Sequence, residues 1–412
     1  MKNRVFFFLT LAMVLSPALK AQNTSNFKFY GFIRDYAYVD THESKVGTAE
    51  LFYYMPLDND NERMSYNFTA ITSRLGVDVS GYEYNGMKVG AKIETDFYNG
   101  LSGITGTAVL RLRQAYMTLG WTGEDKTSTT LKIGQAWHPM AADMPDVISL
   151  NTGAPFGPFA RTPLAQLDYK TSSPLSITAA AVWQMQFTSN GPEGSVANYM
   201  KYSGIPELYL GASYTTAKAT VRAGLDFISI KPVAKSSDRM NAFTPFFYAQ
   251  YKDGLFTAKF KTVFAEAGEH VNLNGGYGVA ANGGYTPTRN SSSWLSLSYG
   301  KEWQGVLFAG YAKNFGTKEA LAQDAAFPGY SSQLYFSKNS FSNMNSMWRL
   351  SPTVIRNLGK VALALEFDIT SVQYGDYAVA GTKLVNAANG LADKNLHTRT
   401  NNRLTFMAKY TF

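Results

Sequence analysis

Apolar and polar residues alternate along most of the chain after residue 25, and the last ten residues, RLTFMAKYTF, show the pattern most clearly. The even-numbered residues from Leu404 to Phe412 are all apolar. They would share one face of an extended strand, because successive side chains point to opposite sides. Most of the intervening residues are polar. The segment therefore predicts a β-strand with one apolar and one polar face.

The same alternation recurs in about sixteen segments, and no long stretch has the period of a helix. Turns or polar loops separate the segments, and no linker or low-complexity tract divides them. We therefore predict an all-β protein whose strands centre near residues 26–39, 67–81, 86–98, 108–121, 129–137, 162–172, 175–187, 199–214, 218–231, 242–252, 255–267, 292–301, 303–315, 345–356, 360–374 and 401–412.

The connections between these segments alternate in length. Short turns such as GYEYNG (81–86) and WTGEDK (121–126) alternate with long loops at 40–66, 99–107, 138–161, 188–198, 268–291, 316–344 and 375–400. Short turns at one end and long loops at the other are typical of outer-membrane barrels. We therefore predict that residues 22–412 form a single transmembrane antiparallel β-barrel with both termini on the periplasmic side. A strand buried in a soluble sandwich is the alternative, but it leaves the alternating lengths unexplained.

The first 21 residues have the order of a secretory signal peptide. Lys2 and Arg4 precede an apolar run from Val5 to Leu15, and the small residue Ala21 ends the segment. No later stretch reaches the ~20 apolar residues that a membrane helix needs. Aromatic residues make up 14% of the chain although its mean hydropathy is only −0.18. Together with one-sided strands, these features indicate the outer membrane of a Gram-negative bacterium.

In such a barrel, the apolar face of the last strand would meet outer-membrane lipid. Tyr410 and Phe412 would then lie in the aromatic girdle at the membrane interface. A last strand that ends in Phe412 also resembles the signal that the outer-membrane assembly machinery reads, so we expect that machinery to be a partner.

Charge and residue usage exclude several other functions. The formal net charge of +8 falls to +5 when the signal peptide, with three basic residues and no acid, is removed. This mild, dispersed charge predicts no nucleic-acid partner, but it could bias a pore toward anions. Four dispersed histidines and no cysteine predict no metal site, and we recognise no catalytic motif or cofactor. Asp58, Asp60 and Glu62 imitate part of a calcium loop that lacks its glycine and distal Glu.

Charged residues concentrate on the polar faces of three neighbouring segments. They are Arg74 in RLGVDV, Lys92, Glu94 and Asp96 in KVGAKIETDF, and Arg111 and Arg113 in LRLRQAY. Arginine facing lipid is costly, so we expect Arg111 and Arg113 to face the lumen, where their planar guanidinium groups suit carboxylate or phosphate oxygens. The alternative is that these charges only form cross-strand pairs along the barrel wall.

The loop at about 138–161 has an unusual composition for a surface loop. It contains four prolines, little charge and several large apolar residues, among them Met140, Phe156 and Phe159. Such residues prefer burial. We therefore predict that this loop folds into the lumen and narrows the pore. Packing of the loop on a neighbouring subunit is the alternative.

Several segments in this region resemble a known family. RLGVDV, KIETDF, LRLRQAYMTLGW, LKIGQAWHP and FARTPLAQLDY resemble, in order, the signature segments of the DcaP-like porins, and GFIRDYAYVD resembles their first strand. The resemblance, clear over residues 26–170, implies a trimeric sixteen-stranded barrel with an inward-folded third long loop that passes small anions such as dicarboxylates. Phosphate-selective porins share a looser version of the pattern.

The resemblance also implies roles for particular residues. Arg111 and Arg113 match the paired basic residues of the family's LRLRxAY segment, and Gln135 matches its GQxW segment. Arg161 matches the basic residue before the family's next strand. His138 stands where the family often has a small hydroxyl residue.

These observations predict an outer-membrane porin for passive diffusion. The loop at 138–161 would narrow its lumen, and Arg74, Arg111, Arg113 and Arg161 would bias it toward small anions. Lys92, Glu94, Asp96, Gln135 and His138 complete the predicted constriction and solute-binding set. The alternatives are a phosphate-selective porin, a general non-specific porin, and a structural or adhesive barrel that binds a partner through the loops at 268–291 and 316–344.

Overall fold

A computed structural model of the chain describes residues 25–47, 52–60, 62–98, 108–149, 152–323, 334–336, 340–376 and 388–412. The predicted signal peptide, residues 1–21, and the predicted loop at 99–107 lie outside the described residues. Within the described part of the chain, no helix has the length and hydropathy needed to cross a membrane.

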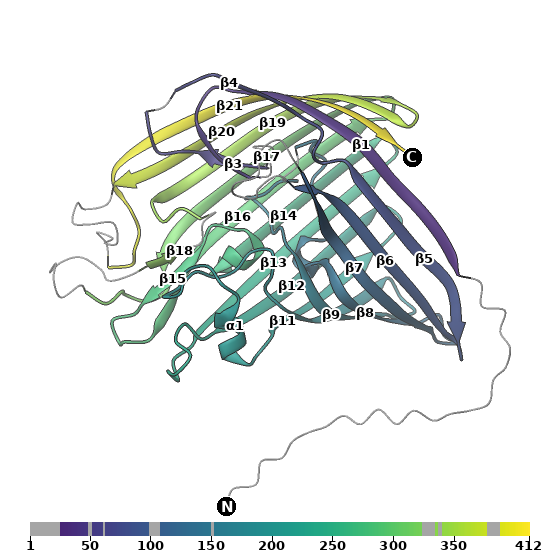
Figure 1. The fold of residues 1–412 in the computed structure, drawn as a ribbon, viewed down its shortest axis with the longest axis horizontal. Helices are drawn as coiled ribbons and strands as arrows, with labels where there is room; N and C mark the ends of the chain where they lie inside the picture. Colours follow the sequence, from purple (N-terminus) through teal and green to yellow (C-terminus); the bar gives the residue numbers. More distant parts are fainter. Residues whose placement is uncertain are drawn as a thin grey trace, which may run out of the picture.

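The described strands form a closed antiparallel barrel of sixteen strands, as the sequence predicts (Figure 1). β4 and β5 share the second position of the wall, because both pair with β1. In chain order the wall consists of β1 (Asn26–Asp40), β4 (Ser65–Thr69) with β5 (Arg74–Tyr84), β6 (Met87–Tyr98), β7 (Val109–Thr122), β8 (Ser128–Trp137), β9 (Arg161–Lys170), β10 (Leu175–Val182), β11 (Glu207–Thr215), β12 (Ala219–Ile230), β13 (Met240–Asp253), β14 (Phe256–Glu266), β16 (Tyr285–Gly300), β17 (Trp303–Thr317), β19 (Met344–Leu358), β20 (Val361–Asp376) and β21 (Lys394–Thr411).

The barrel closes because β1 has a partner along both edges. On one edge it pairs with β21, from Phe32 opposite Thr411 to Asp40 opposite Arg403. On the other edge it pairs with β5 and then with β4. Each wall strand therefore has a neighbour on both sides, which removes the exposed edges that would invite aggregation.

The predicted short turns join strands at one end of the barrel. The turn between β5 and β6 has only two residues, since Tyr84 pairs directly with Met87. Its two central residues, Asn85 and Gly86, have φ angles of 49° and 76°. This conformation is typical of a two-residue type I′ hairpin, whose twist matches that of the strands.

Several boundaries differ from the sequence prediction. β10 ends at Val182 instead of 187, because the chain then turns back and the side chain of Gln184 bonds to Ser189. A short helix, α1 (Asn198–Ser203), occupies the start of the segment predicted as a strand at 199–214, where Tyr199 and Met200 are buried against β12. β16 and β21 begin earlier than predicted, at Tyr285 and Lys394.

The long loops contain further short elements that the sequence analysis did not predict. They are β2 (Ser44–Gly47), β3 (Phe52–Pro56), β15 (Gly276–Val279), β18 (Leu334–Phe336), and the 3-10 turns η1 (Pro139–Ala141) and η2 (Gly268–Val271). β2 pairs with β3, whereas β15 lies between β16 and β18.

The two faces of β21 follow the predicted division. Leu404, Phe406 and Tyr410 are exposed on the outside of the wall, whereas Arg403, Thr405 and Met407 are at most 5% exposed. The same outward apolar face recurs around the barrel, as required for a surface in contact with lipid.

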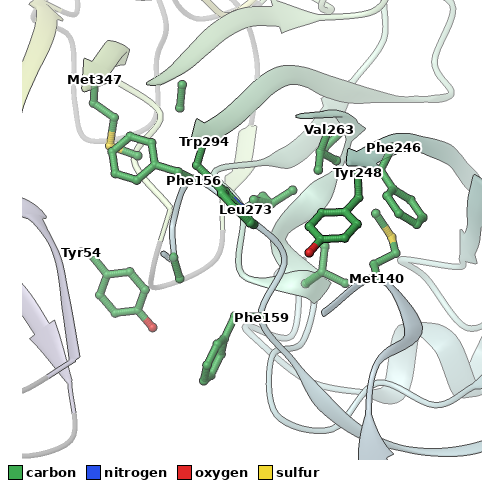
Figure 2. Packing of buried hydrophobic residues seen from close by; sticks show 14 of the residues in the cluster. Tyr54, Met140, Phe156, Phe159, Phe246, Tyr248, Val263, Leu273, Trp294 and Met347 are labelled. Carbon is green, nitrogen blue, oxygen red and sulfur yellow. The ribbon is translucent and has the colours of Figure 1, made fainter. Parts of the chain in front are cut away.

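The inserted loop is the name used here for residues 138–160. Its described parts, residues 138–149 and 152–160, cross the lumen and pack on the wall opposite β8. Figure 2 shows Met140, Phe156 and Phe159 of this loop among buried apolar side chains of the wall and of other loops. Phe156 is fully buried, with its ring centroid 6.1 Å from that of Phe308 on β17. Burying a phenylalanine contributes about 1.5–3 kcal/mol, so the apolar composition of this loop explains its position.

Two glycines permit the close approach of the inserted loop to that wall. A Cβ atom at Gly310 would lie 2.5 Å from the ring of Phe156, and one at Gly157 would lie 2.5 Å from the indole nitrogen of Trp294. Any larger residue at these positions would push the loop away from β16 and β17.

Polar contacts fix the inserted loop along its length. The carboxylate of Glu366 on β20 accepts hydrogen bonds from the backbone N–H groups of Ile148 and Ser149 at 2.9 and 3.1 Å. Asp146 pairs with Lys259 on β14, and Asp143 pairs with Arg222 on β12.

We call β12–β14, β16, β17, β19 and β20 the far wall, and β1 with β5–β9 the near wall. Because the loop covers the far wall, open space remains beside the near wall.

Candidate solute-binding site in the lumen

Six of the nine predicted site residues form one charged network on the near wall: Arg74, Lys92, Glu94, Asp96, Arg111 and Arg113. At its centre, Asp96 accepts two hydrogen bonds from Arg111 at 2.8 Å and one from Arg113 at 2.6 Å. Glu94 accepts one from Arg113 at 2.8 Å and lies 3.5 Å from Arg74. Bidentate, charge-assisted bonds of this kind hold guanidinium groups in fixed orientations.

A β-bulge at Arg113 gives β7 an unusual arrangement in this network. Asp96 is opposite Arg111 and Thr95 is opposite Leu112, but Glu94 is opposite Gln114, so Arg113 has no cross-strand partner. The side chains of Arg113 and Gln114 both reach Glu94. A bulge re-aims side chains in this way by placing two residues against one.

Lys92 lies at the edge of this network, nearer the short turns. Its ammonium group is 2.6 Å from Asp78 and 3.0 Å from the hydroxyl of Tyr30. That hydroxyl donates to Glu94 at 3.1 Å. Tyr30 therefore connects the Lys92–Asp78 pair to the arginine network.

Arg161 is held on aromatic rings instead of carboxylates. Its guanidinium group lies 4.9 Å from the ring centroid of Trp137 and 5.6 Å from that of Phe159. Among the described residues no carboxylate lies within 4 Å of it, and its buried Nη1 has no hydrogen-bond partner. Cation–π contacts orient a guanidinium group while leaving its donors available.

Arg34 on β1 joins this set, although the sequence analysis did not select it. It stacks over the rings of Phe32 and Tyr36, and its Nε donates to Thr72 at 3.0 Å. No carboxylate of the described residues pairs with it. The only signal in the sequence is its place in GFIRDYAYVD, where it shares the lumen face with these two aromatic residues.

These side chains surround a cavity of about 620 Å³ between the near wall and the inserted loop. Among the residues that the structure describes, none that lines it is acidic. Aromatic rings from β1, β3, β6, β8 and the inserted loop supply much of its surface. The basic residues that line it are Arg34, Lys45, Arg74, Arg111, Arg113 and Arg161.

Gln135 and His138 lie outside this cavity. The side-chain amide of Gln135 donates to the backbone carbonyls of Leu112 and Arg113 at 3.1 and 3.0 Å, so it supports the bulged part of β7. His138 is 1% exposed and bonds to Glu207 on β11. Neither side chain is placed to touch a solute in the cavity.

A second cavity, of about 340 Å³, lies beside the near wall closer to the short turns. Trp137 lines both cavities. The second cavity is lined by amides, hydroxyls and both signs of charge, including Gln114, Asp168 and Arg222. The strongly basic lining is therefore a feature of the first cavity and not of the second.

The network predicts a large effect for one carboxylate. Asp96→Asn removes the partner of two arginines at a position that is 2% exposed. Because breaking a buried ion pair leaves charges unpaired, we expect the free energy of unfolding to fall by about 3 kcal/mol. Denaturant unfolding of the purified barrel would measure this. Asp78→Asn is the control, since Asp78 is 43% exposed and its pair with Lys92 should contribute at most ~1 kcal/mol. Equal losses in the two variants would contradict the assignment.

Comparison with known proteins agrees with this architecture. Residues 16–148 match the family model described as DcaP outer membrane protein. The match includes the segments from RLGVDV to LKIGQAWHP and ends before FARTPLAQLDY. No curated protein sequence matches the chain.

Solved structures of porins and channels superpose on nearly the whole chain. The outer membrane channel DcaP of Acinetobacter baumannii has a TM-score of 0.69 at 17% identity, with 96% of this chain and 99% of that chain covered. An anion-selective porin from Comamonas acidovorans has a TM-score of 0.55 at 12% identity, with 94% and 100% covered. At these identities, the likeness establishes the fold. The chain is a Gram-negative outer-membrane β-barrel with the fold of a porin, and its resemblance to the DcaP family is confirmed by the match over residues 16–148.

Proposed function

We propose that this porin passes small hydrophilic solutes by passive diffusion and prefers small anions such as dicarboxylates. The observation that carries the proposal is the cavity of about 620 Å³, whose described lining residues include six basic residues and no acidic one. Its volume lies within the range of about 300–1,000 Å³ that is common for small-molecule sites.

The balance of charge around the cavity supports an anion preference. Glu94 and Asp96 are the carboxylates of the network, and they are occupied by Arg74, Arg111 and Arg113. Arg34 and Arg161 add two positive charges that no described carboxylate pairs within 4 Å. In a narrow passage with low-dielectric walls, such an excess raises the local concentration of anions.

The chemistry of these cations favours carboxylate-bearing solutes. A guanidinium group offers planar, paired donors that match carboxylate geometry, whereas an ammonium group acts as a point charge. Aromatic rings orient Arg111, over Tyr98 at 5.4 Å, and Arg161. The site is therefore organised before a solute arrives.

Selectivity recordings would test this proposal. Arg34→Gln with Arg161→Gln should lower the chloride-to-potassium permeability ratio by about twofold or more, because both charges face the cavity without a carboxylate partner. Reversal potential in a salt gradient measures the ratio, and uptake of a small dicarboxylate against a neutral sugar of similar size provides a second readout.

Arg356→Gln is the matched control, because Arg356 pairs with Glu302 on the short-turn side of the barrel, away from the cavity. Arg111→Gln with Arg113→Gln should act in the same direction as the test variant, but with a loss of stability. Cation selectivity in the wild type, or equal ratios in test and control variants, would refute the anion preference.

We also propose that the inserted loop is the constriction. It contributes Met144, Thr152 and Phe159 to the cavity lining and keeps solutes beside the near wall. Deleting residues 140–157 should increase single-channel conductance several-fold, because the lumen beside the far wall would open, while the wall strands remain paired. Unchanged conductance of a folded deletion variant would place the constriction elsewhere.

A homotrimer is the assembly that we propose for this chain. Among the structural neighbours, a Vibrio cholerae OmpT structure is described as a trimer form. Within this chain, Asp35 lies between the inward-facing Arg34 and the buried Tyr36, so its side chain faces outward. It forms no ion pair with another described residue. A carboxylate facing lipid is unfavourable, whereas a subunit interface would shield it.

The chain contains no cysteine, so a single introduced one can locate the interface. Asp35→Cys should give covalent oligomers with a short bifunctional thiol reagent in native membranes. Phe247→Cys on β13 is the control, because Phe247 is 39% exposed on the outside of another part of the wall. Cross-linking at position 247 but not at 35 would show that the interface lies on the side of β13.

Recognition of Phe412 by the assembly machinery stays a prediction from the sequence.

A further inference from the structure

Two histidines and two carboxylates from four parts of the chain meet beside the far wall. His138 begins the inserted loop, Glu207 begins β11, Asp226 lies on β12, and His270 belongs to η2. Each of these residues is at most 2% exposed. This histidine–carboxylate cluster is separate from the arginine cavity, and the proposed solute selectivity does not use it.

The four side chains converge on a small volume. His138 Nε2 is 2.5 Å from Glu207 Oε1 and 3.8 Å from Asp226 Oδ1. His270 Nε2 is 3.1 Å from Asp226 Oδ2 and 3.8 Å from Glu207 Oε1. A tetrahedral zinc site with bonds of about 2 Å has ligand atoms roughly 3.3 Å apart, so these separations lie on both sides of the required value.

Two further observations point to a ligand between these groups. The buried Oδ1 of Asp226 has no hydrogen-bond partner within the described residues, although it is directed toward His138. Nδ1 of His270 lies 3.0 Å from the backbone carbonyl of Ala267. A histidine that donates from Nδ1 to a carbonyl can bind a metal through Nε2 once the Nε2 proton is displaced, which is the usual arrangement behind a metal-bound histidine.

We propose that His138, Glu207, Asp226 and His270 bind one divalent transition-metal ion, with Zn²⁺ as the best match. Two imidazole nitrogens and two carboxylate oxygens are a common type of zinc coordination, and their charges balance that of the ion. Mg²⁺ and Ca²⁺ fit poorly, because they require six or more oxygen ligands.

Protons are the competitors of the metal in this cluster. Nδ1 of His138 accepts a hydrogen bond from the backbone N–H of Met140 at 3.2 Å, so without a metal its Nε2 carries a proton that it donates to Glu207. Burial by itself lowers the pKa of His270, but Glu207 and Asp226 raise it to about 10. A bound metal would displace the Nε2 proton of His270. The single proton of His138 would move from Nε2 to Nδ1, at the cost of the long hydrogen bond from the Met140 N–H.

The position of the cluster gives the metal a structural role. It would join the first residue of the inserted loop to β11, to β12 and to η2. η2 also contacts the other end of the same loop, where the backbone N–H of Phe159 donates to the carbonyl of Val271 at 2.8 Å. One ion would therefore fix both ends of the segment that fills the lumen.

Metal analysis of the refolded full-length chain tests this proposal. Because the cluster is buried, the protein should be unfolded in denaturant with a chelator, refolded into detergent with equimolar Zn²⁺, and dialysed. Elemental analysis should then find one zinc per chain, and refolding with Mg²⁺ or Ca²⁺ should leave none bound. Substitution of Co²⁺ should give the intense visible absorption of a tetrahedral site.

Variants separate this cluster from other histidines. The chain has only two further histidines, so His42→Ala with His397→Ala should retain the zinc. Glu207→Gln and His270→Gln should each lower retention at least tenfold. Folded wild-type barrel without zinc, or zinc that disappears with His42 and His397, would overturn the proposal. The wild-type measurement decides the question even if the cluster variants do not fold, and it is independent of ion selectivity.

Discussion

The packing of the inserted loop against the far wall is the interaction on which the rest of this structure depends. Phe156 occupies the space above Gly310, and Trp294 approaches Gly157 closely. Glu366 and Lys259 bind the polar groups that remain along the loop. Because apolar burial and these polar contacts act together, the loop has a defined path across the lumen, and the remaining passage lies beside the near wall.

This division of the lumen gives the two walls different electrostatic roles. On the far wall, charges such as Lys259 and Asp146 pair across the interface between loop and strand. On the near wall, the carboxylates pair mainly with neighbouring strands and hold Arg111 and Arg113 in place, while Arg34 and Arg161 rest on aromatic rings. An excess of guanidinium groups therefore faces the passage, and Glu94 and Asp96 stabilise these groups without lining the cavity.

The histidine–carboxylate cluster is directly connected to the inserted loop, because His138 belongs to both. His138 is the first residue after β8, so its bond to Glu207 sets the direction in which the chain leaves the wall. The neighbouring Met140 then reaches the far wall, where its backbone carbonyl accepts from Lys261. With either protons or a metal neutralising the two carboxylates, the cluster anchors the loop at its first residue, His138. Apolar contacts such as that of Phe156 fix the loop further along the chain.

The sequence by itself determined the strand number, the outward faces and the burial of the inserted loop, because two-residue alternation, connection lengths and apolar composition are local properties. The sequence also indicates the bulge at Arg113, because the apolar residues change from even positions (Leu110, Leu112) to odd positions (Ala115, Met117) across it. Only the tertiary structure decided that Gln135 supports a backbone and that His138 meets His270. Those contacts join residues far apart in the chain, and no local pattern specifies such a partner.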